Sequence, residues 1–216
     1  MSGAAGPAPA PLGGAADGRA EGAAGITHLL YLHGFRSSPR STKSRMTHAW
    51  VQANRPDLHW WCPQLPASPR EALRLVMDGI ADWPRERMAV VGSSLGGYYA
   101  TAVAERTGCR AVLLNPAIFP ARDLVKYLGQ QPAWHDPATT IEVRLEHMDE
   151  LQDWAVPAIT RPERYFAVIA KGDEVLDWRE MHARYADCPM RLLEGSDHAL
   201  SGFDQDLPHL TRFLSL

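Results

Sequence analysis

The sequence of 216 residues carries 22 Lys and Arg against 25 Asp and Glu, a formal net charge of −3. A chain of this length fits one domain with a full hydrophobic core. The near-even charge balance provides no large positive field, which argues against nucleic acid or an anionic membrane surface as a partner. The three cysteines, Cys62, Cys109 and Cys188, stand far apart and are odd in number, as is typical of bystander thiols in a reducing compartment.

The first 25 residues are mostly Ala, Gly and Pro, and they lack both the basic start and the continuous apolar run of a signal peptide. This composition buries too little apolar surface to offset the entropy of ordering, so we expect a disordered tail. The folded domain is expected over residues 26–216. No later window has the roughly eighteen uninterrupted apolar residues of a membrane span, and we therefore expect a soluble, cytoplasmic protein.

Short apolar runs alternate with segments of helical spacing along the rest of the chain. The predicted strands are residues 26–32, 58–62, 88–91, 111–114, 165–170 and 190–193. The predicted helices run over residues 42–54, from residue 69 to about 82, from residue 97 to about 105, and over 207–214. This order predicts an α/β fold, with a mainly parallel sheet of about six or more strands and helices on both faces.

One segment interrupts the alternation. About fifty residues, 115–164, separate two consecutive predicted strands, which is too long for a simple crossover. Helix-compatible stretches occur within it at residues 124–129 and 143–154. We expect a helical cap at about residues 116–164, inserted between strands of a single domain.

The segment Gly92-Ser93-Ser94-Leu95-Gly96 matches the pattern Gly-x-Ser-x-Gly. In this pattern a strand turns sharply into a helix and exposes a strained serine, and neighbours without side chains make room for the turn. An apolar run precedes the segment and a plausible helix follows it, which is the required order. The alternative is a purely structural role, in which the glycine-rich turn only packs a helix against the sheet. We predict that Ser94 is a nucleophile.

A serine hydroxyl needs a base to take its proton and an acid to orient that base. His198 lies just past the last predicted strand, and Asp173 lies immediately past the strand before it. Both therefore fall at the same edge of the sheet as Ser94. The chain order Ser94, Asp173, His198 is the one that α/β hydrolases use.

Three other carboxylates lie close enough in sequence to compete with Asp173. They are Glu174, Asp177 and Asp197. Asp197 is adjacent to the histidine, so the two side chains would usually diverge, and Asp177 is more than one helical turn past the strand end. Asp173 remains the predicted acid.

Backbone N–H groups after the nucleophile and after an early strand usually hold the oxyanion of the tetrahedral intermediate. Leu95 and Phe35 fit these two positions. His33 is either a hydrogen-bonding support behind this site or an ordinary loop histidine.

Four cations, Arg36, Arg40, Lys43 and Arg45, lie beside this loop. They predict either a contact to an acidic substrate group, with Arg40 as the test position, or a solvated helix start, which is the more common case. The aromatic side chains face a similar choice between lining an acyl pocket and packing the core; they are Trp60, Trp61, Tyr98, Tyr99 and Trp134.

Several blocks together resemble the YqiA-like family of small bacterial esterases. They are residues 31–35 (YLHGF), 37–39 (SSP), 92–100 (GSSLGGYYA), 114–117 (LNPA), 172–177 (GDEVLD), 197–198 (DH) and 202–203 (GF). The resemblance spans about residue 29 to the C-terminus. It implies an α/β-hydrolase fold, hydrolysis of carboxylic esters or acyl thioesters, and a Ser94, Asp173, His198 triad. Ser196 departs from the family, because a second glycine is expected there.

The sequence thus predicts a cofactor-free serine esterase acting on a small-molecule ester. An acyl-CoA thioesterase with the same machinery is the nearest alternative, and a non-catalytic binding protein of the same fold is a more distant one. The nine histidines include no His-Glu-x-x-His or comparable cluster, so no metal is expected. The pattern does not define an oligomeric state.

Overall fold

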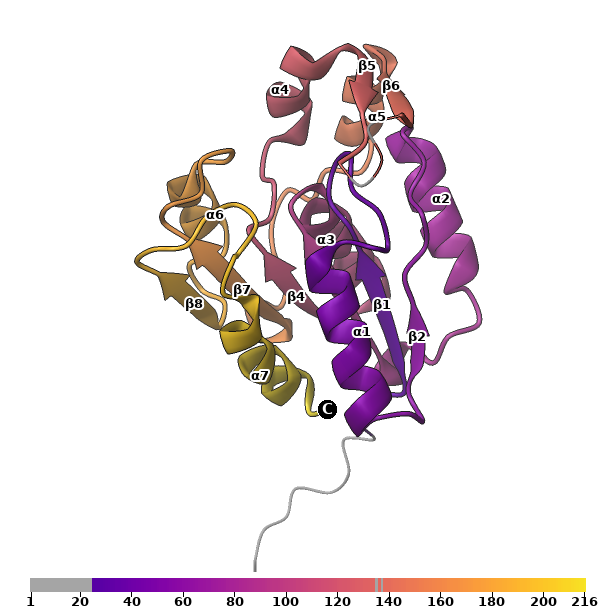
Figure 1. The fold of residues 1–216 in the computed structure, drawn as a ribbon. Helices are drawn as coiled ribbons and strands as arrows, with labels where there is room; N and C mark the ends of the chain where they lie inside the picture. Colours follow the sequence, from indigo (N-terminus) through magenta and orange to yellow (C-terminus); the bar gives the residue numbers. More distant parts are fainter. Residues whose placement is uncertain (1–24, 135, 137) are drawn as a thin grey trace, which may run out of the picture.

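The computed structural model describes residues 25–134, 136 and 138–216. The tail expected at the N-terminus lies outside the described residues, apart from Gly25. Six strands form one parallel sheet in the spatial order β2 His59–Trp61, β1 His28–Leu32, β3 Met88–Ser93, β4 Arg110–Leu114, β7 Tyr165–Ala170 and β8 Met190–Leu193 (Figure 1). The predicted α/β class and the mainly parallel sheet are confirmed, and the bounds of β7 and β8 are the predicted ones.

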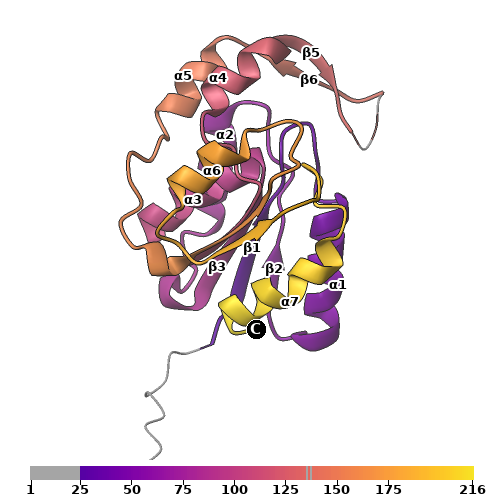
Figure 2. The same cartoon turned by 90° about the vertical axis from the view of Figure 1, so that its left-hand side faces the viewer.

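Helices cover both faces of the sheet, as expected. Helices α1 Thr42–Asn54 and α7 Phe203–Leu214 lie on one face, and α2 Pro69–Gly79, α3 Leu95–Thr107 and α6 Trp178–Arg184 lie on the other (Figure 2). Side chains of β1 alternate between the two cores: Leu30 and Leu32 pack under α2 and α3, while Leu29 and Tyr31 pack under α1 and α7. All four are fully buried.

Local signals explain where two of these helices begin and end. Ser68 caps α2 by accepting a hydrogen bond from the Glu71 N–H, and Pro69 occupies the first helical position. Helix α3 ends at Gly108, whose φ of 77° lies in the left-handed region that glycine adopts without strain. Helix α7 begins four residues before its predicted start, so Pro208 lies inside it.

The inserted segment between β4 and β7 is not wholly helical, which corrects the expected helical cap. It contains α4 Pro120–Leu124, the 3-10 turns η2 Val125–Tyr127 and η3 Pro162–Arg164, α5 Glu146–Gln152, and an antiparallel hairpin of β5 Gly129–Pro132 and β6 Thr140–Val143. Strand β5 is largely exposed and polar, whereas β6 alternates, with Ile141 half-buried and Val143 buried in the core. The segment lies over the carboxyl ends of the main strands (Figures 1 and 2).

The order of the strands places a crevice at that edge. The chain passes from β1 outward to β2 and then returns to β3 on the other side of β1. The connections that leave β1 and β3 therefore diverge at their carboxyl ends, and open α/β sheets bind ligands at such a switch point.

The described residues include no helix long and apolar enough to cross a membrane.

Candidate active site

Ser94 lies between β3 and α3, at the turn that the Gly-x-Ser-x-Gly pattern predicted. Its φ of 55° and ψ of −122° place it in a region that L residues rarely adopt. Such a conformation costs a non-glycine residue on the order of 1–3 kcal/mol, and it persists because the surroundings hold it. The Ser94 N–H donates to the Leu114 carbonyl, and the Ser94 carbonyl accepts from the Ala117 N–H. The strained serine is thus held against the end of β4.

The glycines of this turn are required by close backbone approach. A Cβ added at Gly96 would lie 2.0 Å from the Leu32 carbonyl oxygen, and one added at Gly92 would lie 2.2 Å from the Gly96 carbonyl oxygen. Both contacts are with backbone, which cannot rotate away as a side chain can. Strand β1, strand β3 and helix α3 therefore meet more closely here than any side chain permits.

Substitution of Gly96 by alanine is expected to lower the free energy of unfolding by about 1–3 kcal/mol, because the added methyl group overpacks a rigid contact. The matched control is Gly195→Ala, whose added Cβ meets no described atom within 4 Å. That variant should stay within about 0.5 kcal/mol of the parent protein. Urea denaturation of both variants measures the difference, and equal losses would contradict the close-approach account.

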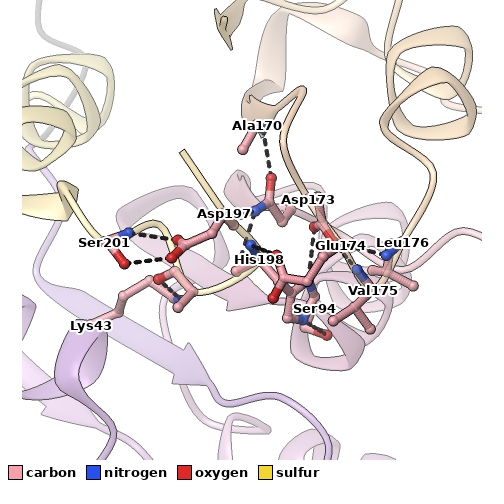
Figure 3. Close-up of polar contacts among 12 residues, drawn as sticks. Lys43, Ser94, Ala170, Asp173, Glu174, Val175, Leu176, Asp197, His198 and Ser201 are labelled. Atoms are coloured by element: carbon pink, nitrogen blue, oxygen red, sulfur yellow. Dashed lines mark hydrogen bonds and ion pairs between the residues drawn. The ribbon is translucent and has the colours of Figure 1, made fainter. Parts of the chain in front are cut away.

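His198 and Asp173 meet Ser94 at the carboxyl edge of the sheet (Figure 3). The His198 Nε2 lies 3.0 Å from the Ser94 Oγ, and the His198 Nδ1 lies 2.7 Å from the Asp173 Oδ2. The Asp173 side chain is fully buried and the His198 side chain is 22% exposed. The structure brings together the three predicted side chains in one hydrogen-bonded chain, with the arrangement of a nucleophile, a base and its orienting acid.

Backbone donors hold the Asp173 carboxylate in place. Its Oδ1 accepts from the N–H groups of Val175 and Leu176, at 2.8 Å each. One oxygen is therefore occupied by the loop after β7, and the other is left to face His198. These hydrogen bonds fix the orientation of the carboxylate.

The three competing carboxylates have separate roles. Glu174 accepts from the backbone N–H of His198 at 2.9 Å, and Asp177 caps α6 through the Arg179 N–H. Asp197 accepts from both the N–H and the hydroxyl of Ser201, and these bonds lower its pKa. Among the described residues, none of these three carboxylates forms a hydrogen bond with the imidazole ring of His198.

The two predicted oxyanion donors lie beside the nucleophile. A Cβ added at Gly34 would lie only 3.1 Å from the Ser94 Cβ, so the loop after β1 passes directly against Ser94. Leu95 is the first residue of α3. Within the described part of the chain, the N–H groups of Phe35 and Leu95 have no protein acceptor. Both are available to a substrate oxygen.

His33 supports the Phe35 donor from behind. It is buried, its Nδ1 lies 3.0 Å from the Gly34 carbonyl oxygen, and its Nε2 accepts from the Leu65 N–H at 3.1 Å. Because Nε2 accepts, the proton of the neutral ring is on Nδ1 and is donated to Gly34. That carbonyl belongs to the same peptide plane as the Phe35 N–H, so His33 orients the donor.

Sequence reasoning missed the role of Asn115, which appeared only as part of a family block. Asn115 is buried at the end of β4 with a φ of 42°. Its amide nitrogen donates to the carbonyls of Asp197 and His198, and its amide oxygen accepts from the Ala170 N–H at the end of β7. It thereby ties β4, β7 and the histidine loop together. The available signal was an asparagine directly after a strand, since Asn tolerates the left-handed region.

Two hollows meet at Ser94 and His198. The apolar pocket, of about 110 Å³, is lined by Phe35, Arg36, Ser94, Leu95, Ala117, Pro120, Asp123, Leu124, Lys126, Tyr127, Trp134, Val175, Leu176 and His198. The polar cleft, of about 540 Å³, is lined by Gly34, Phe35, Ser37, Ser38, Arg40, Ser41, Thr42, Lys43, Ser93, Ser94, Trp134, Glu174, Val175, His198 and Ala199. The serine therefore lies between two compartments, of which the cleft has the larger share of polar surface.

The remaining predicted contacts divide between these hollows and the core. Arg40 lines the polar cleft, and Trp134, which is 70% exposed, lines both compartments. Tyr98 is not brought to Ser94: its hydroxyl donates to the Leu151 carbonyl in α5, and its ring lines a separate cavity of about 280 Å³. Trp60 and Tyr99 pack in the core.

None of the three cysteines lines the pocket or the cleft beside Ser94. All three cysteines are free, and burial raises the pKa of each thiol to about 11. A thiolate nucleophile is disfavoured at such values. Among the described residues, no group of three or more His, Cys, Asp or Glu side chains is placed to hold a metal ion.

Comparison with solved structures defines the class of fold. A protein of Agrobacterium vitis S4 matches with a TM-score of 0.70 at 14% identity, covering 88% of this chain and 91% of that one. Mouse alpha/beta hydrolase domain-containing protein 10 matches with a TM-score of 0.67 at 12% identity, covering 87% and 89%. Est1E of Butyrivibrio proteoclasticus, solved with ferulic acid bound, matches with a TM-score of 0.64 at 12% identity, covering 91% of each chain. The chain has the α/β-hydrolase fold.

The family follows from the sequence. The model of the uncharacterised protein family UPF0227 matches residues 28–215. This chain belongs to that family, which is the YqiA-like family that the sequence blocks indicated.

Proposed function

We propose that this protein is a serine hydrolase that cleaves carboxylic esters through an acyl-enzyme on Ser94. The observation that carries the proposal is the chain of hydrogen bonds from Ser94 through His198 to Asp173, at 3.0 and 2.7 Å. Proteins with the same fold include Est1E and an esterase of Pyrococcus furiosus, which agrees with a hydrolase. The surrounding residues suit each step of the reaction.

In the first step the Ser94 Oγ attacks the ester carbonyl and His198 Nε2 takes the hydroxyl proton. Asp173 accepts the hydrogen bond from Nδ1, which keeps Nε2 unprotonated beforehand and stabilises the imidazolium afterwards. The carbonyl oxygen becomes an oxyanion, which the N–H groups of Leu95 and Phe35 hold. His198 then gives its proton to the leaving alcohol. In the second step His198 activates water, and water attack releases the acid and restores Ser94.

We assign the acyl group to the apolar pocket. Its walls come from the main fold at Leu95 and Leu176 and from the inserted segment at Pro120, Leu124 and Tyr127. We propose that residues 116–164 act in this way as a cap on a single domain of residues 26–216. A cavity of about 150 Å³ holds benzene, so the smaller pocket of about 110 Å³ suits a short acyl chain.

Labelling with a fluorophosphonate tests the proposal. The purified protein should form an adduct that peptide mass spectrometry locates on Ser94, because a base-activated serine attacks the phosphorus centre. The control variant His198→Ala keeps the serine but loses the base, so its labelling should be slower by at least about a hundredfold. An adduct on another residue, or no adduct on a folded protein, would contradict the proposal and favour a non-catalytic binding protein.

A further inference from the structure

The polar cleft has the composition of an anion-recognition site, and it adjoins the proposed nucleophile. Arg40 and Lys43 line it, together with the serine side chains of the loop before α1. The guanidinium of Arg40 has no carboxylate partner among the described residues. A guanidinium left free at the mouth of a catalytic cleft is suited to a carboxylate or a phosphate, which it binds through paired hydrogen bonds.

Lys43 adds a second positive charge, held in position. Its Nζ donates to the Ala199 carbonyl, beside His198 (Figure 3). Burial lowers the pKa of Lys43 to about 8, against the attraction of Asp197 and Asp173. The amine therefore remains mostly protonated at neutral pH.

One carboxylate also lines the cleft, and its negative charge offsets part of the positive charge of Arg40 and Lys43. Glu174 lines the cleft, but one of its oxygens accepts the hydrogen bond from the His198 N–H. Helix α1 begins at the cleft with no acidic residue in its first turn and no side-chain cap from Ser41, so the positive end of its dipole adds to the two cations. Arg40, Lys43 and the start of α1 therefore face the Glu174 carboxylate, while Asp173 and Asp197, which attract Lys43, accept hydrogen bonds elsewhere.

The position of His198 decides which half of the substrate enters the cleft. The base must return its proton to the leaving group, which therefore lies on the histidine side of Ser94. The polar cleft is lined by His198, by its neighbour Ala199 and by Glu174, which bonds its backbone. His198 and Phe35 line both hollows, whereas Glu174 and Ala199 line only the cleft and Leu95, the other oxyanion donor, lines only the apolar pocket.

We infer that the substrate is an ester of a small apolar acid whose leaving alcohol carries a carboxylate or phosphate, and that Arg40 and Lys43 bind this anion. This inference rests on the proposed esterase activity and names its class of substrate. The two cations attract the anion before the substrate binds. In the Michaelis complex, the bound anion orients the leaving oxygen toward His198.

Three acetyl esters with one aromatic ring in common test the inference. Their leaving groups are 4-hydroxybenzoate, 4-hydroxyphenyl phosphate and the neutral 4-hydroxybenzamide. The measured quantity is the ratio of kcat/KM for each anionic ester to that for the amide, compared between variants, so that differences in leaving-group reactivity cancel. We expect Arg40→Gln to lower this ratio by about tenfold for the anion that the site prefers, since a charge-assisted hydrogen bond is lost.

Arg45→Gln is the matched control, because Arg45 is an exposed arginine of α1 that does not line the cleft. Its ratio should stay within about twofold of the parent protein, as is usual for an exposed charge. Added salt should lower the ratio of the parent protein and leave that of Arg40→Gln nearly constant.

The outcomes separate the two proposals. Hydrolysis of all three esters with the same ratio in Arg40→Gln and the parent protein overturns the anion site and leaves the esterase intact. Loss of hydrolysis with no fluorophosphonate adduct overturns the esterase itself, and the anion site with it. If Arg40→Gln lowers the kcat/KM ratio more for one of the two anionic esters, that ester identifies the anion that the site prefers.

Discussion

Replacement of Ser94 by alanine is expected to lower kcat for a short-chain aryl ester by about 10⁵-fold to 10⁶-fold, as removal of a triad nucleophile does in other serine hydrolases. The Ser94 Oγ is the atom that forms the bond to the acyl group. Without this oxygen, His198 can activate only water. The residual rate should come from the Leu95 and Phe35 donors and from binding alone.

Folding must survive for this result to be informative. The backbone conformation of residue 94 costs alanine and serine a similar free energy. The backbone hydrogen bonds from residue 94 to Leu114 and Ala117 remain in the variant. The melting temperature should therefore stay within about 4 °C of the parent value, which corresponds to roughly 1 kcal/mol in a domain of this size. A folded Ser94→Ala protein that keeps more than a few per cent of the activity would exclude the acyl-enzyme on this residue.

The second large effect is expected at Asp173. Asp173→Asn should lower kcat by about 10⁴-fold with little change in stability, the loss measured for the equivalent substitution in another triad. If the new side chain keeps its oxygen toward the N–H groups of Val175 and Leu176, its NH₂ group faces His198 Nδ1. The imidazole then carries its proton on Nε2 and cannot accept one from Ser94.

Two neighbouring acids serve as comparisons for Asp173. Asp177→Asn should retain nearly full activity, because asparagine caps a helix as well as aspartate does and Asp177 lies at the start of α6. Glu174→Gln should cost much less than Asp173→Asn, since an amide oxygen still accepts from the His198 N–H. A larger loss in Glu174→Gln than in Asp173→Asn would transfer the acid role to Glu174. Steady-state kinetics on one ester across the three variants measures the order.

Local patterns were sufficient for the central sheet and for the nucleophile turn. The strands β7 and β8 have the predicted bounds, because each is a short, mainly apolar run ended by turn residues. The turn at Ser94 could also be predicted, because the strand, the two glycines and the helix follow one another within a short stretch of sequence, although the contact that requires Gly96 is with the distant Leu32. The left-handed φ of 73° at Ser196 also agrees with the glycine that the family resemblance led us to expect there.

Contacts between distant segments decided the rest. The hairpin of β5 and β6 and the helix α6 escaped prediction because they are short, with four, four and seven residues, and so few positions reveal little periodicity. The roles of Asn115 and Tyr98 depend on partners more than fifty residues away in sequence. Residue types and chain order therefore define which groups can react here, whereas the packing of the inserted segment and α1 around Ser94 creates the two compartments, because a hollow is a property of the walls that surround it.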